Sequence, residues 1–107
     1  MPTEVLDPAL MRVAAEDVAD KLKILANPDR LLLLCQLSQG ERCVGDLEEV
    51  LDIRQPTLSQ QLRVLRHEGV VRTRRSGKYI NYSVADQQLL QVLTLLYELY
   101  CPKENRP

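Results

Sequence analysis

One stretch decides the fold of this chain: Gln55-Pro56-Thr57-Leu58-Ser59-Gln60-Gln61-Leu62-Arg63-Val64-Leu65-Arg66-His67-Glu68-Gly69. Its three leucines recur at helical spacing and predict a short helix with one buried face. Pro56 suits a first helical position, because an N–H would have no helical partner there. Gly69 suits the left-handed residue that ends many helices. The stretch therefore predicts one short helix with clear boundaries.

The same helix carries an unusual set of polar side chains. Its first turns present Thr57, Ser59, Gln60, Gln61 and Arg63. A helix that needs only to be soluble usually carries Glu and Lys, whereas Ser, Thr, Gln and Arg reach base edges and phosphates in a DNA major groove. We therefore predict that this helix contacts DNA, with Gln55 and Arg66 as further candidate contacts.

The residues before it predict a second, shorter helix with an apolar stripe made of Val44, Leu47, Val50 and Leu51. Ile53 would fill the turn between the two helices. Helix, short turn and polar-faced helix is the helix-turn-helix pattern of DNA-binding proteins. On these residues alone, a plain pair of packed helices in an α-bundle remains the alternative.

The segment after Gly69 predicts a basic β-hairpin. Residues 70–75 and 78–84 alternate in the manner of strands, and Ser76-Gly77 between them is a turn signal. Its exposed face would carry Arg72, Arg74, Arg75 and Lys78. A basic hairpin directly after a helix-turn-helix is a wing, which would lie against the phosphate backbone or the minor groove. A hairpin made soluble by charge is the alternative, but it does not explain why these charges share one sign.

Charge is divided unevenly along the chain. The net charge is only −1, yet residues 54–78 hold seven basic residues and one acidic residue, a net +6 that leaves −7 for the rest. A local basic footprint on an acidic body fits a protein that docks one edge on nucleic acid. Each Arg–phosphate contact would add salt-dependent affinity, and the acidic remainder would help to orient the approach.

The chain's 107 residues predict a single domain, mainly α with a small β-hairpin, in which residues 1–7 and 103–107 are expected to be flexible. No apolar run is long enough to span a membrane, and the first residues do not resemble a signal peptide, so we expect a cytoplasmic protein. The sequence has no Cys-x-x-Cys motif, no catalytic His–Cys arrangement and no Gly-rich cofactor loop. We therefore expect neither an enzyme nor a cofactor, with a thiol enzyme as the remote alternative.

Further helices are predicted around this centre. Asp7-Pro8 would open one that runs to about Leu25, Asn27-Pro28 another to about Leu37, and Asp86 a last one to about Tyr100. Leu31 to Leu34 predict that the second helix is the buried centre. The first and last helices carry more apolar residues than one small core can cover, which predicts a homodimer through them. A compact monomer is the alternative.

The order of helices, helix-turn-helix, wing and last helix resembles the ArsR-type winged-helix repressors over about Val18 to Cys101. The resemblance is carried by Leu25-Ala26-Asn27-Pro28-Asp29-Arg30-Leu31, Val44-Gly45-Asp46-Leu47, Gln55 to Leu65, Gly69-Val70-Val71 and Tyr79-Ile80-Asn81-Tyr82. It implies a homodimeric repressor that leaves double-stranded operator DNA when an inducer binds.

Two metal sites of that family are incomplete in this sequence. The zinc-sensing members use an Asp followed two residues later by a His, but here Gln88 follows Asp86, so Asp86 is better explained as a helix N-cap. The arsenite- and cadmium-sensing members carry Cys-Val-Cys-Asp-Leu, but here Gly45 replaces the second thiol after Cys43. A soft metal wants two or three thiolates. Such a site would therefore need Cys43 together with Cys35, Cys101 or both, and this remains the alternative.

The other two cysteines are similar in placement to the dithiol of the reactive-sulfur and redox-sensing branch, the BigR, SqrR and HlyU-like repressors. Cys35 ends the apolar run of the second helix, and Cys101 ends the last helix just before Pro102. The resemblance implies that persulfides or other oxidants bridge the pair and lower operator affinity, with Cys101 as the attacking thiol and Cys35 as its resolving partner. Without the resemblance, Cys35 would be an inert core residue. The native inducer, whether persulfide, other oxidant or metalloid, stays open.

Overall fold

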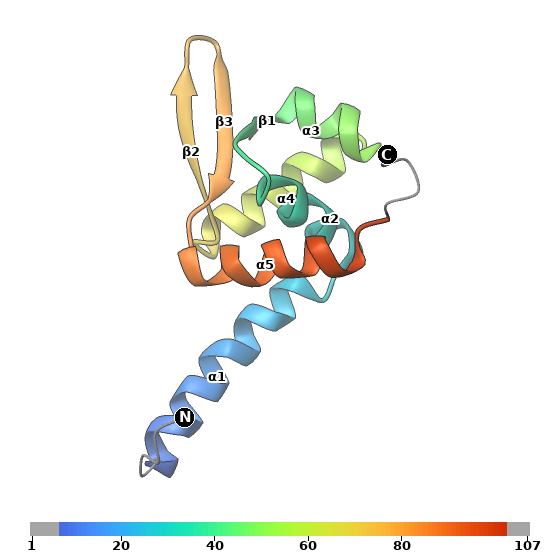
Figure 1. The fold of residues 1–107 in the computed structure, drawn as a ribbon. Coiled ribbons are helices and arrows are strands. Elements are labelled where there is room, and N and C mark those ends of the chain that lie inside the picture. Colours follow the sequence, from blue (N-terminus) through green and yellow to red (C-terminus); the bar gives the residue numbers. More distant parts are fainter. Residues whose placement is uncertain (1–6, 103–107) are drawn as a thin grey trace.

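The structure, a computed structural model, describes residues 7–102 (Figure 1). Its elements in chain order are α1 (Pro8–Leu25), α2 (Pro28–Leu37), β1 (Arg42–Cys43), α3 (Val44–Leu51), α4 (Gln55–His67), β2 (Val71–Ser76), β3 (Tyr79–Val84) and α5 (Gln87–Tyr100). This is a winged helix-turn-helix, which confirms the predicted fold class. The expectations about residues 1–6 and 103–107 lie outside the described part, and Asp7 has a defined role as the N-cap of α1.

The sheet differs from the predicted hairpin by one strand. β2 and β3 form the expected antiparallel pair, and β1 adds to the other edge of β3, with Arg42 opposite Tyr82 and Cys43 opposite Asn81. The expected element order, four helices, two strands and a helix, therefore lacked β1. Two residues are too few to show the alternation that marks a strand, and the pairing partner lies far away in the sequence.

Three helices begin where the sequence predicted. The side chains of Asp7, Asn27 and Asp86 each accept backbone N–H groups of the first helical turn, and Pro8 and Pro28 follow the first two of these caps. These side chains satisfy donors that have no partner within the helix. The start of each of these helices is thus set by residues within its own first turn or just before it.

The core is built from leucine and valine around α2. Leu33, Leu34 and Leu37 of α2 are buried together with Leu58, Leu62 and Leu65 of α4 and Leu93 of α5. α2 packs against all four other helices and against β3. The prediction that α2 is the buried centre agrees with Leu33 and Leu34, which are 0% exposed, but Leu32 is 51% exposed, because the elements packed around α2 leave one side of the helix uncovered.

α1 projects from this body as a long arm, shown in blue in Figure 1. Its residues from Pro8 to Asp20 are exposed, including Leu10, Val13 and Val18. α5 also exposes large apolar side chains, at Val92, Leu95 and Leu99. Among the described residues no helix is both long and apolar enough to cross a membrane.

Candidate functional site

Helix α4, which the sequence predicted to contact DNA, has one buried and one exposed face. Leu58, Leu62 and Leu65 are 0–1% exposed and hold the helix on the core. The opposite face presents Gln60 and Arg63 to solvent, and Gln55, Thr57 and Arg66 are also exposed. α3 precedes α4 through a tight turn in which Asp52 takes a left-handed conformation, with φ 55°. This geometry leaves one polar face of α4 open to a duplex.

Gln61 has a different environment from its neighbours. It is half-buried, and its Oε1 accepts a hydrogen bond from Arg30 Nη1 of α2 at 3.3 Å. Arg30 Nε also donates to the carbonyl oxygen of Ile24 at 2.8 Å. Gln61 therefore points toward α2, and this hydrogen bond links α4 to the central helix. Ser59 is half-buried as well.

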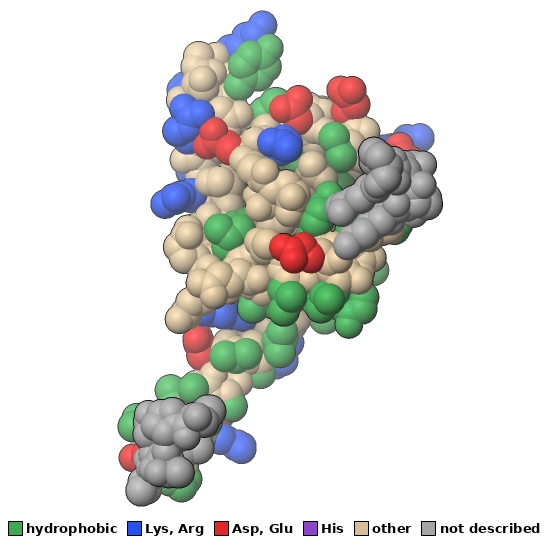
Figure 2. Space-filling model, viewed as in Figure 1, with side chains coloured by type: hydrophobic (Ala, Val, Ile, Leu, Met, Phe, Trp, Pro, Cys, Tyr) green, Lys and Arg blue, Asp and Glu red, His purple; other side chains and the backbone are tan. Residues whose placement is uncertain are grey.

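The wing is a regular hairpin with a basic outer edge. Val71 to Ser76 pair with Val84 to Tyr79, and Gly77 makes the turn with a left-handed φ of +62°. Arg72, Arg75 and Lys78 are exposed, and Lys78 Nζ lies 5.5 Å from the centre of the Tyr79 ring. In Figure 2 positive side chains line the outer edge of the hairpin and an apolar group sits at its tip. The wing therefore has a row of exposed, positively charged side chains along the β2–β3 hairpin.

Arg74 of the wing is already engaged within the chain. Its Nη2 lies 2.6 Å from Oε1 of Glu41, and its Nε donates to Oε2 of Glu41 at 3.1 Å. The hydrogen bond from Arg74 holds the pKa of Glu41 below its usual value. Glu41 was not predicted from the sequence, because this carboxylate precedes β1 and lies outside the basic segment. This two-pronged ion pair fastens the wing to the loop before β1.

Cys35 and Cys101 line the same pocket. The pocket has a volume of about 480 Å³ and lies between α2, α3 and α5. Both thiols are free and half-buried. Burial raises the pKa of Cys35, and the nearby Cys101 raises it further. The structure therefore brings together the two cysteines that the family resemblance paired.

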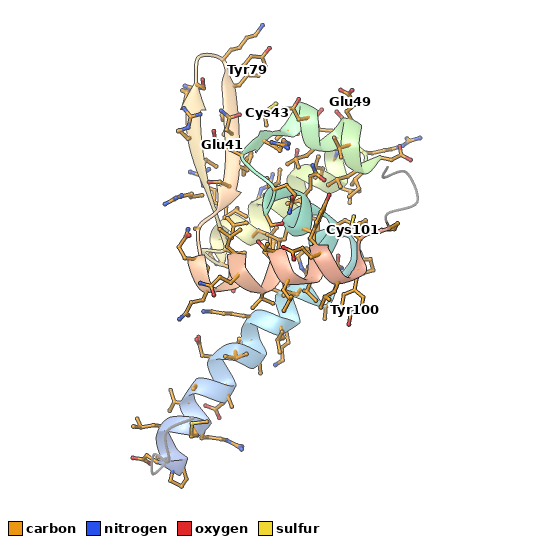
Figure 3. All side chains as sticks on the ribbon, viewed as in Figure 1. Glu41, Cys43, Glu49, Tyr79, Tyr100 and Cys101 are labelled. Carbon is orange, nitrogen blue, oxygen red and sulfur yellow. The ribbon has the colours of Figure 1, made fainter. Side chains whose placement is uncertain are left out.

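Cys43 lies elsewhere. It ends β1 and precedes α3, whereas Cys101 follows α5, and Figure 3 shows the two well separated. Within residues 7–102 no group of three or more His, Cys, Asp or Glu side chains is placed to hold a metal ion. The three cysteines therefore do not form one metal-binding group within the described part of the chain.

Asp86 acts as a helix cap, as predicted. Its Oδ1 accepts the backbone N–H groups of Gln88 and Leu89, each at 3.0 Å, and its Oδ2 lies 2.9 Å from Lys21 Nζ. The N–H of Leu89 and then Lys21 are the main causes that lower the pKa of Asp86. This carboxylate joins the start of α5 to α1.

His67 is exposed at the end of α4.

Comparison with known proteins gives consistent matches. Residues 27–73 match the model of the family described as bacterial regulatory protein, arsR family. The chain is 52% identical over 103 residues to a biofilm growth-associated repressor of Agrobacterium fabrum, which covers 95% of this chain and 87% of that protein.

Two solved structures have the same fold. The crystal structure of the transcriptional repressor BigR from Xylella fastidiosa has a TM-score of 0.79 and 44% identity, and covers 91% of this chain and 99% of that one. Reduced HlyU from Vibrio cholerae has a TM-score of 0.80 and 35% identity, and covers 86% of this chain and 97% of that one.

Proposed function

Because the chain belongs to the ArsR family of bacterial regulatory proteins, we propose that it is a transcriptional repressor whose operator affinity falls when Cys35 and Cys101 become bridged. It is a regulator and not an enzyme. Both the biofilm growth-associated repressors and BigR, to which it is similar, are repressors by name. The single observation that carries the switch is that two thiols distant in sequence line one pocket.

The DNA-binding surface in this proposal is the outer face of α4 together with the wing. Gln55, Thr57, Gln60, Arg63 and Arg66 face a major groove, while Arg72, Arg75 and Lys78 contact backbone phosphates. Ser59, Gln61 and Arg74 belong to the same surface but are half-buried or engaged within the chain. Bases would be specified from α4, and salt-dependent affinity would come mainly from the wing.

A homodimer through α1 and α5 completes the proposal. α1 exposes Leu10, Val13 and Leu22, and α5 exposes Leu95 and Leu99, so both helices keep apolar surface that one chain does not cover. A twofold pair that covered this surface would present two recognition helices. Their spacing on a duplex would then match half-sites about 34 Å apart, one helical turn of DNA.

The two thiols have different roles in the bridging step. Because burial raises the pKa of Cys35, less of it is the thiolate that attacks sulfur, so Cys101 reacts first. Cys101 takes the outer sulfur of a persulfide RSSH, giving Cys101–S–SH and RSH. The Cys35 sulfur then attacks the inner sulfur of Cys101–S–SH. A Cys35–Cys101 disulfide forms, and H₂S leaves with the proton of Cys35. The persulfide is the oxidant.

The bridge would act on DNA binding through α2 and α5. It would join the end of α2 to the end of α5, and Arg30 of the same α2 holds Gln61 of the recognition helix. α5 is also half of the proposed dimer contact, so a shift there alters the spacing of two recognition helices. A coupling free energy of ~1–3 kcal/mol would weaken operator binding about 5–150-fold.

Serine variants test this proposal. A duplex that the reduced protein binds is selected from random sequences, and its affinity is measured before and after treatment with a persulfide. Cys35→Ser and Cys101→Ser are expected to bind DNA normally and to keep that affinity after treatment. Cys43→Ser is the matched control and should still be released. Release of Cys35→Ser by the persulfide, or release by arsenite that requires Cys43, would contradict the dithiol assignment.

A further inference from the structure

We propose that the pocket beside Cys35 and Cys101 selects sulfur donors whose organic part is apolar and uncharged. This inference rests on the proposed function and names the class of inducer that the same site accepts. It follows from the composition and size of the pocket wall, and from the place of the two thiols in it.

Among residues 7–102, no charged side chain lines the pocket. Apart from the two cysteines it is formed by Leu31, Leu32, Gln36, Leu51, Leu96, Tyr97, Tyr100 and Pro102. Among these, only the amide of Gln36 and the hydroxyl groups of the two tyrosines are polar side-chain groups. A carboxylate or ammonium group that enters such a wall gives up water without gaining an ionic partner. An alkyl arm gains free energy instead, because its apolar surface leaves water.

The pocket is large enough for a substrate and is open to solvent. Its volume of about 480 Å³ lies within the ~300–1,000 Å³ typical of small-molecule sites. Tyr100 in its wall is 76% exposed, and Figure 3 shows this side chain projecting away from the body of the domain. Cys101, the next residue in the chain, also lines the pocket and is only half-buried. A donor can therefore enter beside Cys101, the thiol that attacks first.

The chemistry is balanced for an uncharged donor such as a dialkyl trisulfide, R–S–S–S–R. The thiolate of Cys101 attacks an outer sulfur and forms Cys101–S–S–R, and the perthiolate leaves and takes up a proton as RSSH. The Cys35 sulfur attacks the Cys101 sulfur of this mixed disulfide, and RSH leaves with the proton of Cys35. The trisulfide is reduced and the two thiols are oxidised to a disulfide. No other reactant is required.

Two trisulfides that differ in charge test the inference directly. Diethyl trisulfide is uncharged, whereas bis(2-carboxyethyl) trisulfide carries two carboxylates at neutral pH. The rate at which each forms the Cys35–Cys101 bridge is followed by mass spectrometry of the full-length protein. Each rate is divided by the rate with free N-acetylcysteine amide, which removes the intrinsic difference in reactivity. We expect a preference on the order of tenfold for the uncharged donor.

Two Gln→Lys variants place a cation inside or outside the pocket. Gln36 lines the pocket, whereas Gln39, three residues further along and past the end of α2, is exposed and outside the pocket. Gln36→Lys is expected to shrink the preference toward unity, because its ammonium group pairs with the incoming carboxylate. Gln39→Lys adds the same charge and should keep the wild-type preference. The ratio of the two rates is the readout, so a change in thiol reactivity common to both donors cancels.

The outcomes separate the inference from the proposed function. If a persulfide forms the bridge but neither trisulfide does, the inference is overturned and the proposed function stands. If the persulfide does not form the bridge either, the proposed function fails. If both trisulfides form it at equal normalised rates, the proposed function stands and the inference is overturned. An equal effect of Gln36→Lys and Gln39→Lys would also overturn it, because the selection would then come from overall charge and not from the pocket. The wild-type comparison decides the matter even if a lysine variant does not fold.

Discussion

The wing and the thiol pocket lie toward opposite ends of α5 and are formed by different types of side chain. α5 starts beside the base of the β2–β3 hairpin and ends at the pocket (Figure 1). The wing is exposed and positively charged, whereas the part of the pocket wall formed by residues 7–102 is mostly apolar and carries no charge. A polyanionic duplex is attracted by charge in water, while a sulfur transfer is favoured where charged and bulky polar molecules are excluded. In the proposed function, these two tasks are separated in space.

The two regions remain connected through α2 and α5. α2 contributes Cys35 to the pocket and holds the recognition helix through the Arg30–Gln61 hydrogen bond. α5 packs on α2 and β3 with Leu93 fully buried between them and the rest of the core. A substitution in the wing or in the pocket should therefore have only local effects unless it changes α2 or α5.

The largest expected effect comes from breaking the connection itself. Leu93→Ala removes a side chain that is 0% exposed, and the resulting cavity should lower the free energy of unfolding by about 2–5 kcal/mol. Gln91→Ala, on the exposed side of the same helix, should change it by less than about 0.5 kcal/mol. Urea denaturation of both variants measures the difference. Equal effects would mean that α5 is not packed on the core as described.

The second prediction perturbs only the DNA-binding side. Arg63→Ala should weaken binding to the selected duplex by ~1–3 kcal/mol, about 5–150-fold, because it removes a cation from the outer face of α4. Its rate of thiol bridging should stay unchanged. Arg12→Ala is the control, since Arg12 is exposed on α1 and pairs with Glu16 at 3.5 Å. Fluorescence anisotropy at fixed salt measures the affinity. Equal losses in both variants would show that net charge alone sets binding.

The structural features that depend on neighbouring residues in the chain could be predicted from the sequence. The helix boundaries followed from Asp7-Pro8, Asn27-Pro28 and Asp86, because caps and prolines act within one turn. The wing followed from alternation around Ser76-Gly77. The cysteine pair was found only through the family resemblance, since spacing along the chain does not show which helix ends meet in space.

The features that were missed are pairings between distant segments. β1 exists because Arg42 and Cys43 pair with β3, and two residues carry no strand pattern of their own. Glu41 and Arg74 form an ion pair across 33 positions of sequence, and Arg30 and Gln61 a hydrogen bond across 31. Polar residues of these types are common on any surface. Their partners become visible only when the fold places them within hydrogen-bonding distance.

The third prediction concerns the cap that joins α5 to α1. Asp86→Ala removes the cap and should cost about 0.5–2 kcal/mol of stability at neutral pH. Because the pKa of Asp86 is lowered in the fold, its contribution is complete above the unfolded value of about 3.9 and is lost as the pH falls through the lowered folded value. Asp86→Asn keeps a capping oxygen and should lose this dependence on pH. Thermal melts between pH 7 and pH 3 measure both. A wild-type stability that fell no more than that of Asp86→Asn would contradict the prediction.

The smallest effect is expected where the wing meets its own carboxylate. Glu41→Gln should release Arg74 from its ion pair and raise DNA affinity by less than about fivefold. In the wild type, Arg74 must break its ion pair with Glu41 before it can contact a phosphate, and in the variant this cost is removed. The salt dependence of binding should also become steeper. In the wild type, Arg74 lowers the pKa of Glu41, so the carboxylate stays ionised and paired at neutral pH. As the pH falls through that lowered pKa, Glu41 becomes protonated, and the DNA affinity of the wild type should approach that of Glu41→Gln.

The control for this last prediction is Glu49→Gln. Glu49 is exposed on α3 and stands apart from Glu41 in Figure 3, so the variant removes the same charge without touching the Arg74 pair. If both variants raise affinity equally, general repulsion of DNA by acidic residues is the cause. If Glu41→Gln lowers affinity, the ion pair holds the wing in its binding position, and Arg74 serves DNA binding through the geometry of the hairpin and not by direct contact. A rise confined to Glu41→Gln would place Arg74 among the phosphate contacts of the wing.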